Sequence, residues 1–280
     1  MLLATLCFSL MNVVVKKISH LPAIELVFFR CFIAMSIALA MSKRLKLNWL
    51  GNNHKLLVLR GTFGTIALFA LFLSLQKIPL ASAMTIQYLS PVFTTVIAIF
   101  LLGESVRPIQ WIFYLISFVG VFVIKGFDTR ISTVYFLICL SSALFSGLAY
   151  NMVRSLKEKE HHLVVVLHFQ FVGVIAGLLF AIFNWKMPQG TDWAWLILIG
   201  VLAHLGQISL TKAFHNEKVS SISILNYTGI VYGLLFGYFF FNEGYTIQTL
   251  IGIALVVGGV ILSIIYQKRK TALPADLTEA

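Results

Sequence analysis

Residues 80–102 read LASAMTIQYLSPVFTTVIAIFLL, an apolar run that is long enough to cross a membrane as one helix. Residues 219–241 read VSSISILNYTGIVYGLLFGYFFF, a run of the same length that begins 139 positions later. Aligned without a gap, the two runs place a tyrosine opposite a tyrosine and a carboxamide opposite a carboxamide. The match indicates that the chain contains two copies of one structural unit. The matched pairs are Tyr88 with Tyr227 and Gln87 with Asn226.

The same offset extends beyond these runs, because residues 1–130 align with residues 140–269 without a gap. The identities are sparse, but they fall at polar residues and glycines and keep one register from end to end. If each copy holds an odd number of membrane spans, the second copy crosses the membrane in the opposite orientation. Inverted repeats of this kind are typical of secondary transporters, whose sites lie between the repeats. The further matches are Asn12 with Asn151, Gly61 with Gly200, Glu104 with Glu243 and Gly120 with Gly259.

The composition excludes an ordinary soluble protein. Hydrophobic residues make up 59% of the 280 residues and charged residues only 11%, whereas a soluble domain carries about 25% charged residues. The net charge of +11 does not indicate a nucleic-acid partner, because the basic residues lie in short loops between apolar runs, where they set orientation. We therefore predict a polytopic protein whose surroundings are the lipid bilayer.

Ten apolar runs approach the about 20 residues that a transmembrane helix needs. They predict an all-α integral membrane fold of ten transmembrane helices, arranged as two inverted five-helix repeats. With the N-terminus in the cytoplasm, most of the 21 lysines and arginines, Arg60 among them, fall on the cytoplasmic side, so we expect both termini there. No secretory signal with a cleavage site is present, which fits a bacterial inner membrane. The runs are 2–16, 22–42, 56–76, 80–102, 107–125, 132–153, 162–183, 193–213, 219–241 and 246–266.

The sequence contains no motif that indicates catalysis or nucleotide hydrolysis. GxSxG, HExxH and Walker motifs are all missing from it. We therefore expect neither an enzyme nor an ATP-driven pump, and we expect no cofactor. The cysteines Cys7, Cys31 and Cys139 lie inside apolar runs without ligand spacing, so they indicate neither a disulfide framework nor a metal site. They are predicted to be small buried hydrophobic residues.

Several short motifs keep a fixed order along the chain. The first half contains Leu21-Pro22, Glu25, Phe28-Phe29-Arg30, Arg60-Gly61, Ile78-Pro79-Leu80-Ala81-Ser82-Ala83, Ser90-Pro91-Val92-Phe93, Leu102-Gly103-Glu104 and Gly120-Val121, and the second half contains Phe241-Asn242-Glu243 and Gly258-Gly259-Val260. With these motifs the chain resembles the drug/metabolite transporter superfamily, specifically its ten-helix EamA-type members, over residues 2–266. The resemblance implies transport of a small solute.

The repeat and the resemblance divide the chain into three parts. Residues 1–130 are expected to form the first EamA-like repeat, residues 131–267 the second, inverted one, and residues 268–280 a cytoplasmic tail. The second repeat departs from the first at two positions, where Ile230 stands opposite Pro91 and Phe169 stands opposite Arg30. The two halves are therefore expected to move unequally.

Polar residues inside a membrane span are costly unless they are paired or line a cavity. Pro91 lies four residues after Gln87 and cannot donate a hydrogen bond to its carbonyl, which leaves that carbonyl free for a ligand or a neighbouring helix. By pseudosymmetry, the polar faces of the fourth and ninth spans are expected to meet near the membrane centre and to bind a small polar or zwitterionic substrate. The alternative is that these groups only tie helices together by hydrogen bonds. The groups concerned are Gln87, Tyr88, Asn226 and Tyr227.

Two asparagines and an arginine are further candidates for substrate binding. Asn12 and Asn151 are matched polar positions of the first and sixth spans. Arg30 is the one cation placed well inside a predicted span, where it would attract a carboxylate. The alternatives are that Arg30 extends to the interface or pairs with Glu25, although a spacing of five puts those two on different helix faces.

His204 is the remaining candidate, because its pKa near neutrality would let it carry a coupling proton. Its alternative is a hydrogen-bonded packing role. Glu104 and Glu243 end matched helices, and we expect each to cap the helix that follows, with a gate as the second possibility. One face of the ninth span carries glycines that allow close helix packing, either within the chain or as the seam of a homodimer. These glycines are Gly229, Gly233 and Gly237.

These observations predict a secondary transporter or facilitator of small polar metabolites, amino acids or related compounds, that works by alternating access. Uptake of S-adenosylmethionine and export of hydrophobic drugs stay open within this class. A cationic drug would favour an intramembrane carboxylate, and Glu25 is the one acidic residue inside a predicted span. A non-transporting membrane assembly partner is the alternative from another class.

Overall fold

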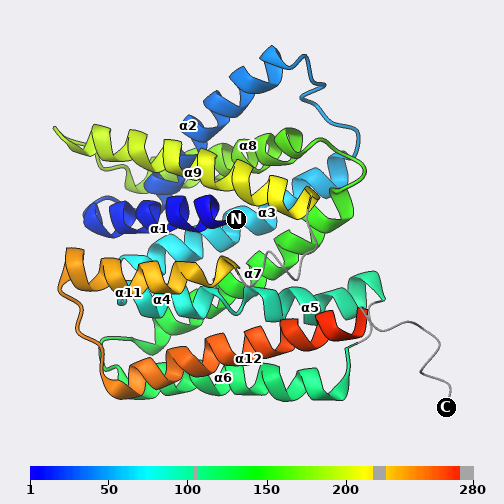
Figure 1. Ribbon diagram of the computed structural model, residues 1–280. Coiled ribbons are helices and arrows are strands. Elements are labelled where there is room, and N and C mark those ends of the chain that lie inside the picture. Colours follow the sequence, from blue (N-terminus) through cyan, green and yellow to red (C-terminus); the bar gives the residue numbers. More distant parts are fainter. Residues whose placement is uncertain (104–105, 217–224, 272–280) are drawn as a thin grey trace.

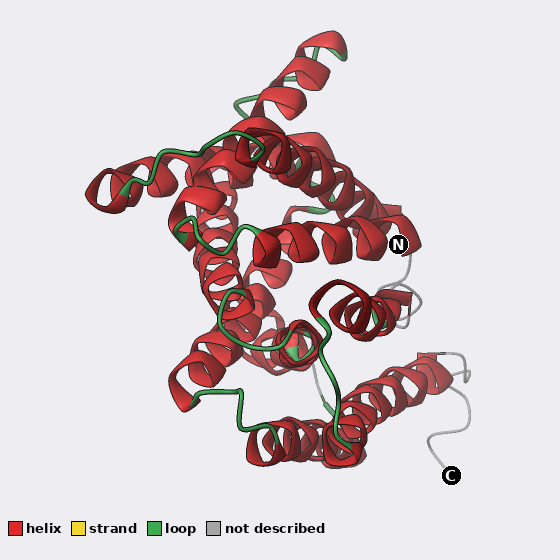
Figure 2. Ribbon diagram, turned by 90° about the vertical axis from the view of Figure 1, so that its left-hand side faces the viewer, coloured by secondary structure: helices red, strands yellow, loops and turns green. Residues whose placement is uncertain are grey.

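The computed structural model describes residues 1–103, 106–216 and 225–271, and nearly all of them are helical (Figure 1). The view turned by 90° shows helices joined by loops, without a strand in that part of the chain (Figure 2). The elements are α1 (Leu2–Lys17), α2 (Ala23–Arg44), α3 (His54–Leu75), α4 (Leu80–Gln87), α5 (Ser90–Leu102), α6 (Pro108–Phe127), α7 (Thr133–Leu156), α8 (His162–Ala181), the 3-10 turn η1 (Ile182–Asn184), α9 (Asp192–Asn216), α11 (Thr228–Phe241) and α12 (Ile247–Thr271).

The length and composition of the helices fit a membrane. Within the described residues, eight helical segments are long and apolar enough to cross a bilayer, α4 and α5 counting as one, and α11 is a shorter apolar helix of 14 residues. Large apolar side chains cover the outside of the bundle, with Phe100 83% and Phe183 80% exposed. Exposing such an apolar surface to water would be unfavourable, whereas exposing it to lipid is not. The chain is therefore an all-α integral membrane protein.

Helix ends follow local backbone chemistry that repeats between the halves. α5 ends at Gly103, whose φ of 67° is left-handed, and α11 ends at Asn242, whose φ of 50° is left-handed as well. A left-handed residue after the last turn is a common helix end, and glycine and asparagine are the residues that adopt it most readily. The two positions are 139 apart, so the offset found in the sequence also relates backbone conformations.

The predicted span 80–102 is not one continuous helix. α4 ends at Gln87 and α5 begins at Ser90, with Tyr88 and Leu89 between them. Pro91 has no N–H to give to the Gln87 carbonyl, and Val92 N donates instead to Leu89 O at 2.9 Å. The predicted span thus consists of two consecutive helices, and the break between them places Tyr88 in the middle of the bundle.

Helices at matching positions of the two halves pack against each other in opposite directions. α6 and α12 lie side by side and run antiparallel to each other (Figure 1). Gly120 contacts the carbonyl of Gly252, and Gly259 contacts the carbonyl of Phe113, so residue numbers rise along one helix as they fall along the other. α2 and α8 show the same arrangement. Their contacts are Phe28 with Gly177 and Cys31 with Gly173.

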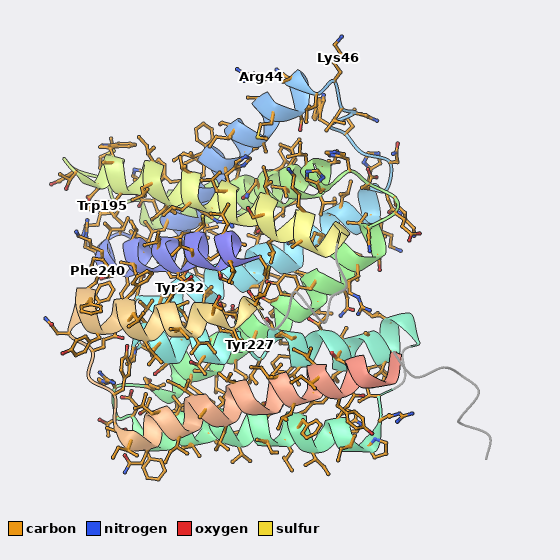
Figure 3. The ribbon with its side chains drawn as sticks, in the orientation of Figure 1. Arg44, Lys46, Trp195, Tyr227, Tyr232 and Phe240 are labelled. Atoms are coloured by element: carbon orange, nitrogen blue, oxygen red, sulfur yellow. The ribbon has the colours of Figure 1, made fainter. Side chains whose placement is uncertain are left out.

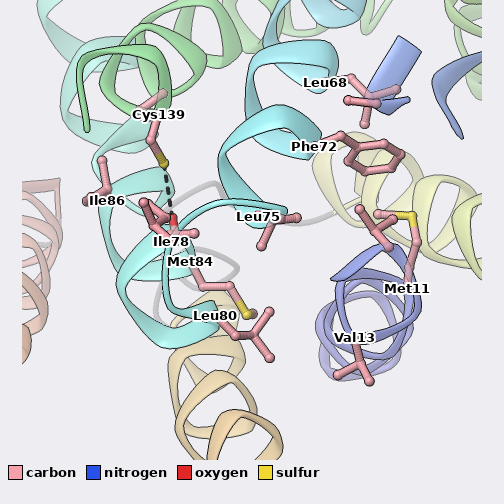
Figure 4. Packing of buried hydrophobic residues seen from close by; sticks show 14 of the residues in the cluster. Met11, Val13, Leu68, Phe72, Leu75, Ile78, Leu80, Met84, Ile86 and Cys139 are labelled. Atoms are coloured by element: carbon pink, nitrogen blue, oxygen red, sulfur yellow. Dashed lines mark hydrogen bonds between the residues drawn. The ribbon is translucent and has the colours of Figure 1, made fainter. Parts of the chain in front are cut away.

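The interior between α1, α3 and α4 is filled by aliphatic, aromatic and sulfur-containing side chains (Figure 4). Phe72 is fully buried, and Met11 and Met84 are each 3% exposed. Cys139 Sγ donates a weak hydrogen bond to Ala83 O at 3.5 Å, which joins α7 to α4. All three cysteines are free and buried, which confirms their prediction as small hydrophobic residues.

The bundle has two ends, which we name after one glutamate at each. The Glu160 end contains the connections 45–53 and 157–161, and there Asn52 N and Asn53 N both donate to Glu160 Oε1. The Glu243 end contains the connections 18–22, 76–79, 128–132, 182–191 and 242–246. Figure 3 shows Tyr227 near the middle of the bundle, Phe240 towards the Glu243 end, and Arg44 at the tip of α2.

Candidate functional site

A cavity with a volume of about 140 Å³ lies inside the bundle, where helices of both halves meet. It is large enough for several water molecules or a small solute. Its walls combine apolar, polar and positively charged side chains, and none of the described residues that line it is acidic. The lining residues are Phe8, Met11, Asn12, Arg30, Arg60, Gly64, Ala67, Leu68, Leu71, Met84, Gln87, Tyr88, Ser90, Ser146, Ala149, Tyr150, Phe169, Gln207, Leu210 and Asn226.

The cavity contains five of the eight residues that the sequence predicts as substrate contacts. Gln87 and Tyr88 reach it from the break between α4 and α5, and Asn226 reaches it from the residues just before α11. Asn12 of α1 and Arg30 of α2 complete the group. The fold therefore brings together polar residues that are as far as 214 positions apart in the sequence.

The Gln87 carboxamide is held by two serines of α7. Its Nε2 donates to Ser146 Oγ at 2.7 Å, and Ser142 Oγ lies 2.8 Å from its Oε1. Ser142 Oγ also lies 2.6 Å from Ala67 O, and its single proton serves one of these two acceptors at a time. Gln87 is thus both part of the cavity wall and a tie between α4 and α7.

Tyr88 and Tyr227 meet at the helix break. Their ring centroids are 5.4 Å apart, and Tyr227 Oη donates to Tyr88 O at 3.2 Å. This carbonyl has lost its usual intrahelical donor, because Val92 N bonds to Leu89 O instead. Tyr227 itself lies behind the cavity wall rather than among its lining residues. Gly229 gives the Tyr88 hydroxyl its space, since a Cβ at Gly229 would collide with that oxygen.

Asn12 offers the cavity an unused hydrogen-bond acceptor. It is 5% exposed, and its Oδ1 has no hydrogen-bond partner. A buried polar atom without a partner is costly and is usually found where a ligand or water completes it. Gln207 lines the same space, with its Nε2 at 3.5 Å from Thr211 Oγ1.

Arg30 lies deep in the protein at 2% exposure. Its Nη1 donates to Gln170 Oε1 at 3.0 Å, its guanidinium carbon lies 5.0 Å from the centre of the Phe169 ring, and its Nε has no partner. Glu25 does not pair with it, because that carboxylate accepts a hydrogen bond from Lys186 N at the Glu243 end. Arg30 therefore neither extends to the interface nor forms the predicted alternative pair.

Arg60 is a cavity residue that the sequence reasoning missed. The charge count assigned it to the cytoplasmic side, yet it belongs to α3, lines the cavity and is 3% exposed. Its guanidinium carbon lies 4.4 Å from the centre of the Phe169 ring, and its Nε and Nη1 have no hydrogen-bond partner. The signal that could have found it is Asn53, which caps α3 through Leu56 N and so places Arg60 nearly two turns inside the helix.

Asn151 and His204 lie outside the cavity wall. Asn151 Nδ2 donates to Thr94 O at 2.9 Å and to Gly147 O at 3.1 Å, which ties α7 to α5. His204 is 2% exposed, and its Nε2 lies 3.3 Å from Met41 Sδ. The asparagines that the offset matches thus have different surroundings, since Asn12 faces the cavity and Asn151 binds a neighbouring helix.

Five residues at the Glu243 end are joined by hydrogen bonds and one ion pair, and we call this group the Glu243 clamp: Lys16, Ile78, Leu80, Glu243 and Tyr245. Lys16 Nζ lies 2.9 Å from Glu243 Oε1 and donates to Ile78 O at 2.6 Å. Leu80 N donates to both Glu243 oxygens, and Tyr245 Oη donates to Oε2 at 3.2 Å. Burial, followed by the nearby carboxylate, raises the pKa of Tyr245, so the phenol remains a donor.

The clamp corrects one expectation about helix capping. Glu243 caps the first turn of α4 through Leu80 N, rather than the helix that follows it in the chain. Its partner in the repeat, Glu104, lies outside the described residues. Among the residues that the structure describes, no three His, Cys, Asp or Glu side chains gather as a metal site requires.

Comparison with known proteins gives two matches to one family model. The model of the EamA-like transporter family matches residues 1–126 and again residues 133–265. The "Pseudopaline exporter CntI" of Pseudomonas aeruginosa is 30% identical over 258 residues, which cover 91% of each chain. Human "Solute carrier family 35 member G1" is 27% identical over 91% of this chain and 75% of its own length.

A more distant relative and a solved structure extend the comparison. The "S-adenosylmethionine uptake transporter" of Rickettsia prowazekii is 23% identical over 95% of this chain and 94% of its own. One crystal structure matches with a TM-score of 0.68 at 20% identity, over 96% of this chain and 99% of the other. At that identity the structural match shows the fold alone.

Proposed function

Because the chain belongs to the EamA-like transporter family of the drug/metabolite transporter superfamily, we propose that it is a secondary transporter or facilitator of small polar metabolites. Amino acids or related compounds are the substrate class, and alternating access is the mechanism. The observation that carries the proposal is the cavity, which is lined by Gln87, Tyr88 and Asn12 of the first half and by Asn226 and Gln207 of the second. A pathway between two halves requires a polar space of this kind.

The architecture we propose is ten transmembrane helices in two inverted repeats, residues 1–130 and 131–267, followed by the tail 268–280. The double match of the family model and the antiparallel packing of matching helices support it. Contacts between residues exactly one offset apart support it further, since a residue touches its own counterpart only near a twofold axis. These contacts are the Tyr88–Tyr227 ring pair, the stacking of Arg30 on Phe169, and Ser117 Oγ at 3.3 Å from Val256 O.

We also propose a bacterial inner membrane as the location, with both termini in the cytoplasm. Basic residues are denser in the connections of the Glu160 end than in those of the Glu243 end, and short cytoplasmic loops carry the excess of Lys and Arg. The Glu243 clamp then faces the outside and closes the cavity on that side. The basic residues near the Glu160 end are Lys43, Arg44, Lys46, Lys55, Arg107, Arg154, Lys157 and Lys159.

The alternatives from the sequence gain less support. A cationic drug or the sulfonium group of S-adenosylmethionine would be repelled by the two arginines that line the cavity, and the described lining residues include no carboxylate to offset that repulsion. A membrane assembly partner has no need of an internal polar cavity. A homodimer stays a proposal that must use another surface, because the glycine face of α11 packs within the chain. On that face Gly229 contacts Tyr88, Gly233 contacts Met84 and Gly237 contacts Tyr245.

Counterflow in proteoliposomes tests the proposed function. The purified protein is reconstituted with unlabelled compound inside, and uptake of labelled amino acids or S-adenosylmethionine is followed. We expect saturable accumulation that Tyr88→Ala abolishes and that Tyr232→Ala leaves intact, because the Tyr232 ring stacks on Phe236 of the same helix and does not line the cavity. A lack of accumulation for every compound, from protein that elutes as a folded species, would refute transport of this substrate class.

A further inference from the structure

The cavity holds two buried guanidinium groups that no acidic residue neutralises. Arg30 and Arg60 are 2% and 3% exposed, and both line the cavity. Across the described residues, neither arginine takes part in an ion pair. A charge inside a membrane protein is costly and is retained where it pairs with something or serves a pathway. The fold therefore maintains two positive charges whose partner is not part of the described chain.

Both guanidinium groups are stacked on one aromatic ring. The guanidinium carbons of Arg30 and Arg60 lie 5.0 Å and 4.4 Å from the centre of the Phe169 ring. The ring holds the two groups through cation–π attraction, and this leaves Arg30 Nε, Arg60 Nε and Arg60 Nη1 without an acceptor. Gly64 contributes by having no side chain, since a Cβ there would collide with Arg60 Nη1 and with the Phe169 ring.

The unsatisfied atoms show what would complete the site. Arg30 Nε, Arg60 Nε and Arg60 Nη1 are buried donors without an acceptor, and Asn12 Oδ1 is a buried acceptor without a donor. A carboxylate accepts two parallel N–H bonds from one guanidinium, which is the strongest hydrogen-bonded pairing available to arginine. One carboxylate would leave the second guanidinium uncompensated, whereas two would neutralise both.

We propose that the Arg30–Phe169–Arg60 cluster selects substrates of net negative charge that carry two carboxylates, and that Asn12 accepts a hydrogen bond from an amino group of the same molecule. An acidic amino acid such as glutamate is the simplest compound with this chemistry. The inference rests on the proposed function and narrows it, because it excludes neutral amino acids and cationic compounds as preferred substrates.

Competition in the counterflow assay tests the charge requirement. Accumulation of labelled L-glutamate is measured in the presence of an unlabelled competitor, which is L-glutamate, L-glutamine, glutarate, L-arginine or S-adenosylmethionine. Glutamate and glutamine have nearly the same shape and differ in one negative charge, so they isolate the second carboxylate. We expect glutamine to compete at least 10-fold more weakly than glutamate. We expect glutarate, which lacks the amino group, to compete between the two.

Variants separate the charge of the cluster from its geometry. Arg30→Gln and Arg60→Gln each remove one positive charge. Either substitution is expected to raise the KM for glutamate at least 10-fold, which brings it close to the KM for glutamine. Gly64→Ala keeps both charges but displaces the stack, so it should also raise the glutamate KM. Arg44→Gln is the matched control, because Arg44 is exposed at the tip of α2 and far from the cavity.

Thermal unfolding of the detergent-purified protein supplies a readout that does not depend on transport. Glutamate and glutarate are expected to raise the unfolding temperature of the parent chain and of Arg44→Gln, but not of Arg30→Gln or Arg60→Gln. Equal transport of glutamine or S-adenosylmethionine would overturn the inference and leave the proposed function standing. If neither glutamate nor glutarate raises the unfolding temperature, the dicarboxylate inference is overturned whatever the transport result. If folded protein transports none of the compounds, the proposed function is overturned.

Discussion

Replacing Glu243 by glutamine removes the charge that joins three chain segments at one end of the bundle. The Glu243 carboxylate lies 2.9 Å from Lys16 Nζ of α1 and accepts hydrogen bonds from Leu80 N at the start of α4. Its side chain is 8% exposed and that of Lys16 is 17% exposed, so solvent screens the pair only weakly. We expect Glu243→Gln to favour conformations in which the Glu243 end is open.

The size of the effect follows from the contacts that are lost. A hydrogen bond to a charged group contributes about 1.5–3 kcal/mol, and removing one member of a buried ion pair costs about 3–5 kcal/mol. Lys16 keeps its bond to Ile78 O at 2.6 Å and some contact with solvent, which reduces the loss. A net change of about 2 to 3 kcal/mol is expected, which shifts the closed-to-open equilibrium by about 30- to 150-fold.

Accessibility of a cysteine at Met84 measures this shift. Met84 lines the cavity from α4, the helix that begins at the Glu243 clamp. In a chain whose three native cysteines are replaced by alanine, Met84→Cys is labelled with a membrane-impermeant maleimide applied from the Glu243 side. The labelling rate should rise with Glu243→Gln by a factor close to the equilibrium shift, as long as opening and closing are faster than labelling.

Asp128→Asn is the matched control for this prediction. It also neutralises a carboxylate at the Glu243 end, but Asp128 pairs with Arg130, two residues away, and its link to the second half runs through the bond of Arg130 Nη2 to Gly244 O at 3.0 Å, which the substitution leaves in place. Its labelling rate should stay near that of the parent. An unchanged rate in Glu243→Gln, with the protein still folded, would refute the reasoning that the clamp limits opening at this end.

Three further substitutions test contacts around the helix break. Gly229→Ala should lower the unfolding temperature by several degrees in detergent, because overpacking against the Tyr88 hydroxyl costs about 1–3 kcal/mol; Gly258→Ala, which meets open space, should not lower it. Tyr227→Phe should destabilise the protein by about 1 kcal/mol in chemical unfolding, because the Tyr88 carbonyl loses its donor while the ring contact remains. Asn151→Ala should lower stability by about 1–2 kcal/mol and leave the substrate KM unchanged, since its amide bonds to α5 and α7 and not to the cavity; a changed KM would contradict this.

The general fold follows from the sequence because lipid leaves few choices. A span in hydrocarbon must satisfy its own backbone and be apolar over about 20 residues, so runs such as 56–76 identify helices directly. The expectation that the polar faces of the fourth and ninth spans meet also anticipates that Tyr88 and Tyr227 lie together. These inferences need only periodicity and length.

The site depends on details that such patterns do not contain. Pro91 indicates a free carbonyl at Gln87, but only the packed structure shows that the helix breaks at Tyr88 and that the Tyr88 carbonyl accepts a hydrogen bond from Tyr227. Arg60 lies within the predicted span 56–76 but near its start, so it was placed with the loop charges, and only the packed structure shows that its side chain lines the cavity. The matched asparagines likewise differ only in their neighbours, which the offset between the repeats does not specify.

Two positive charges in a cavity whose described lining residues include no acidic one would also couple the protein to the membrane potential. Moving one elementary charge through 100 mV changes its free energy by about 2.3 kcal/mol, and two charges that each cross half of the field give the same total. This free energy biases the equilibrium between the inward-facing and outward-facing forms about 50-fold. An empty carrier would be held by an inside-negative potential with its cavity towards the cytoplasm. Glutamate, whose net charge is −1, would cancel one of the two positive charges of Arg30 and Arg60, so the loaded carrier would turn outward with half of the electrical work that the empty carrier requires. Voltage alone would then favour release outside and return of the empty form, which gives a passive carrier a preferred direction of export.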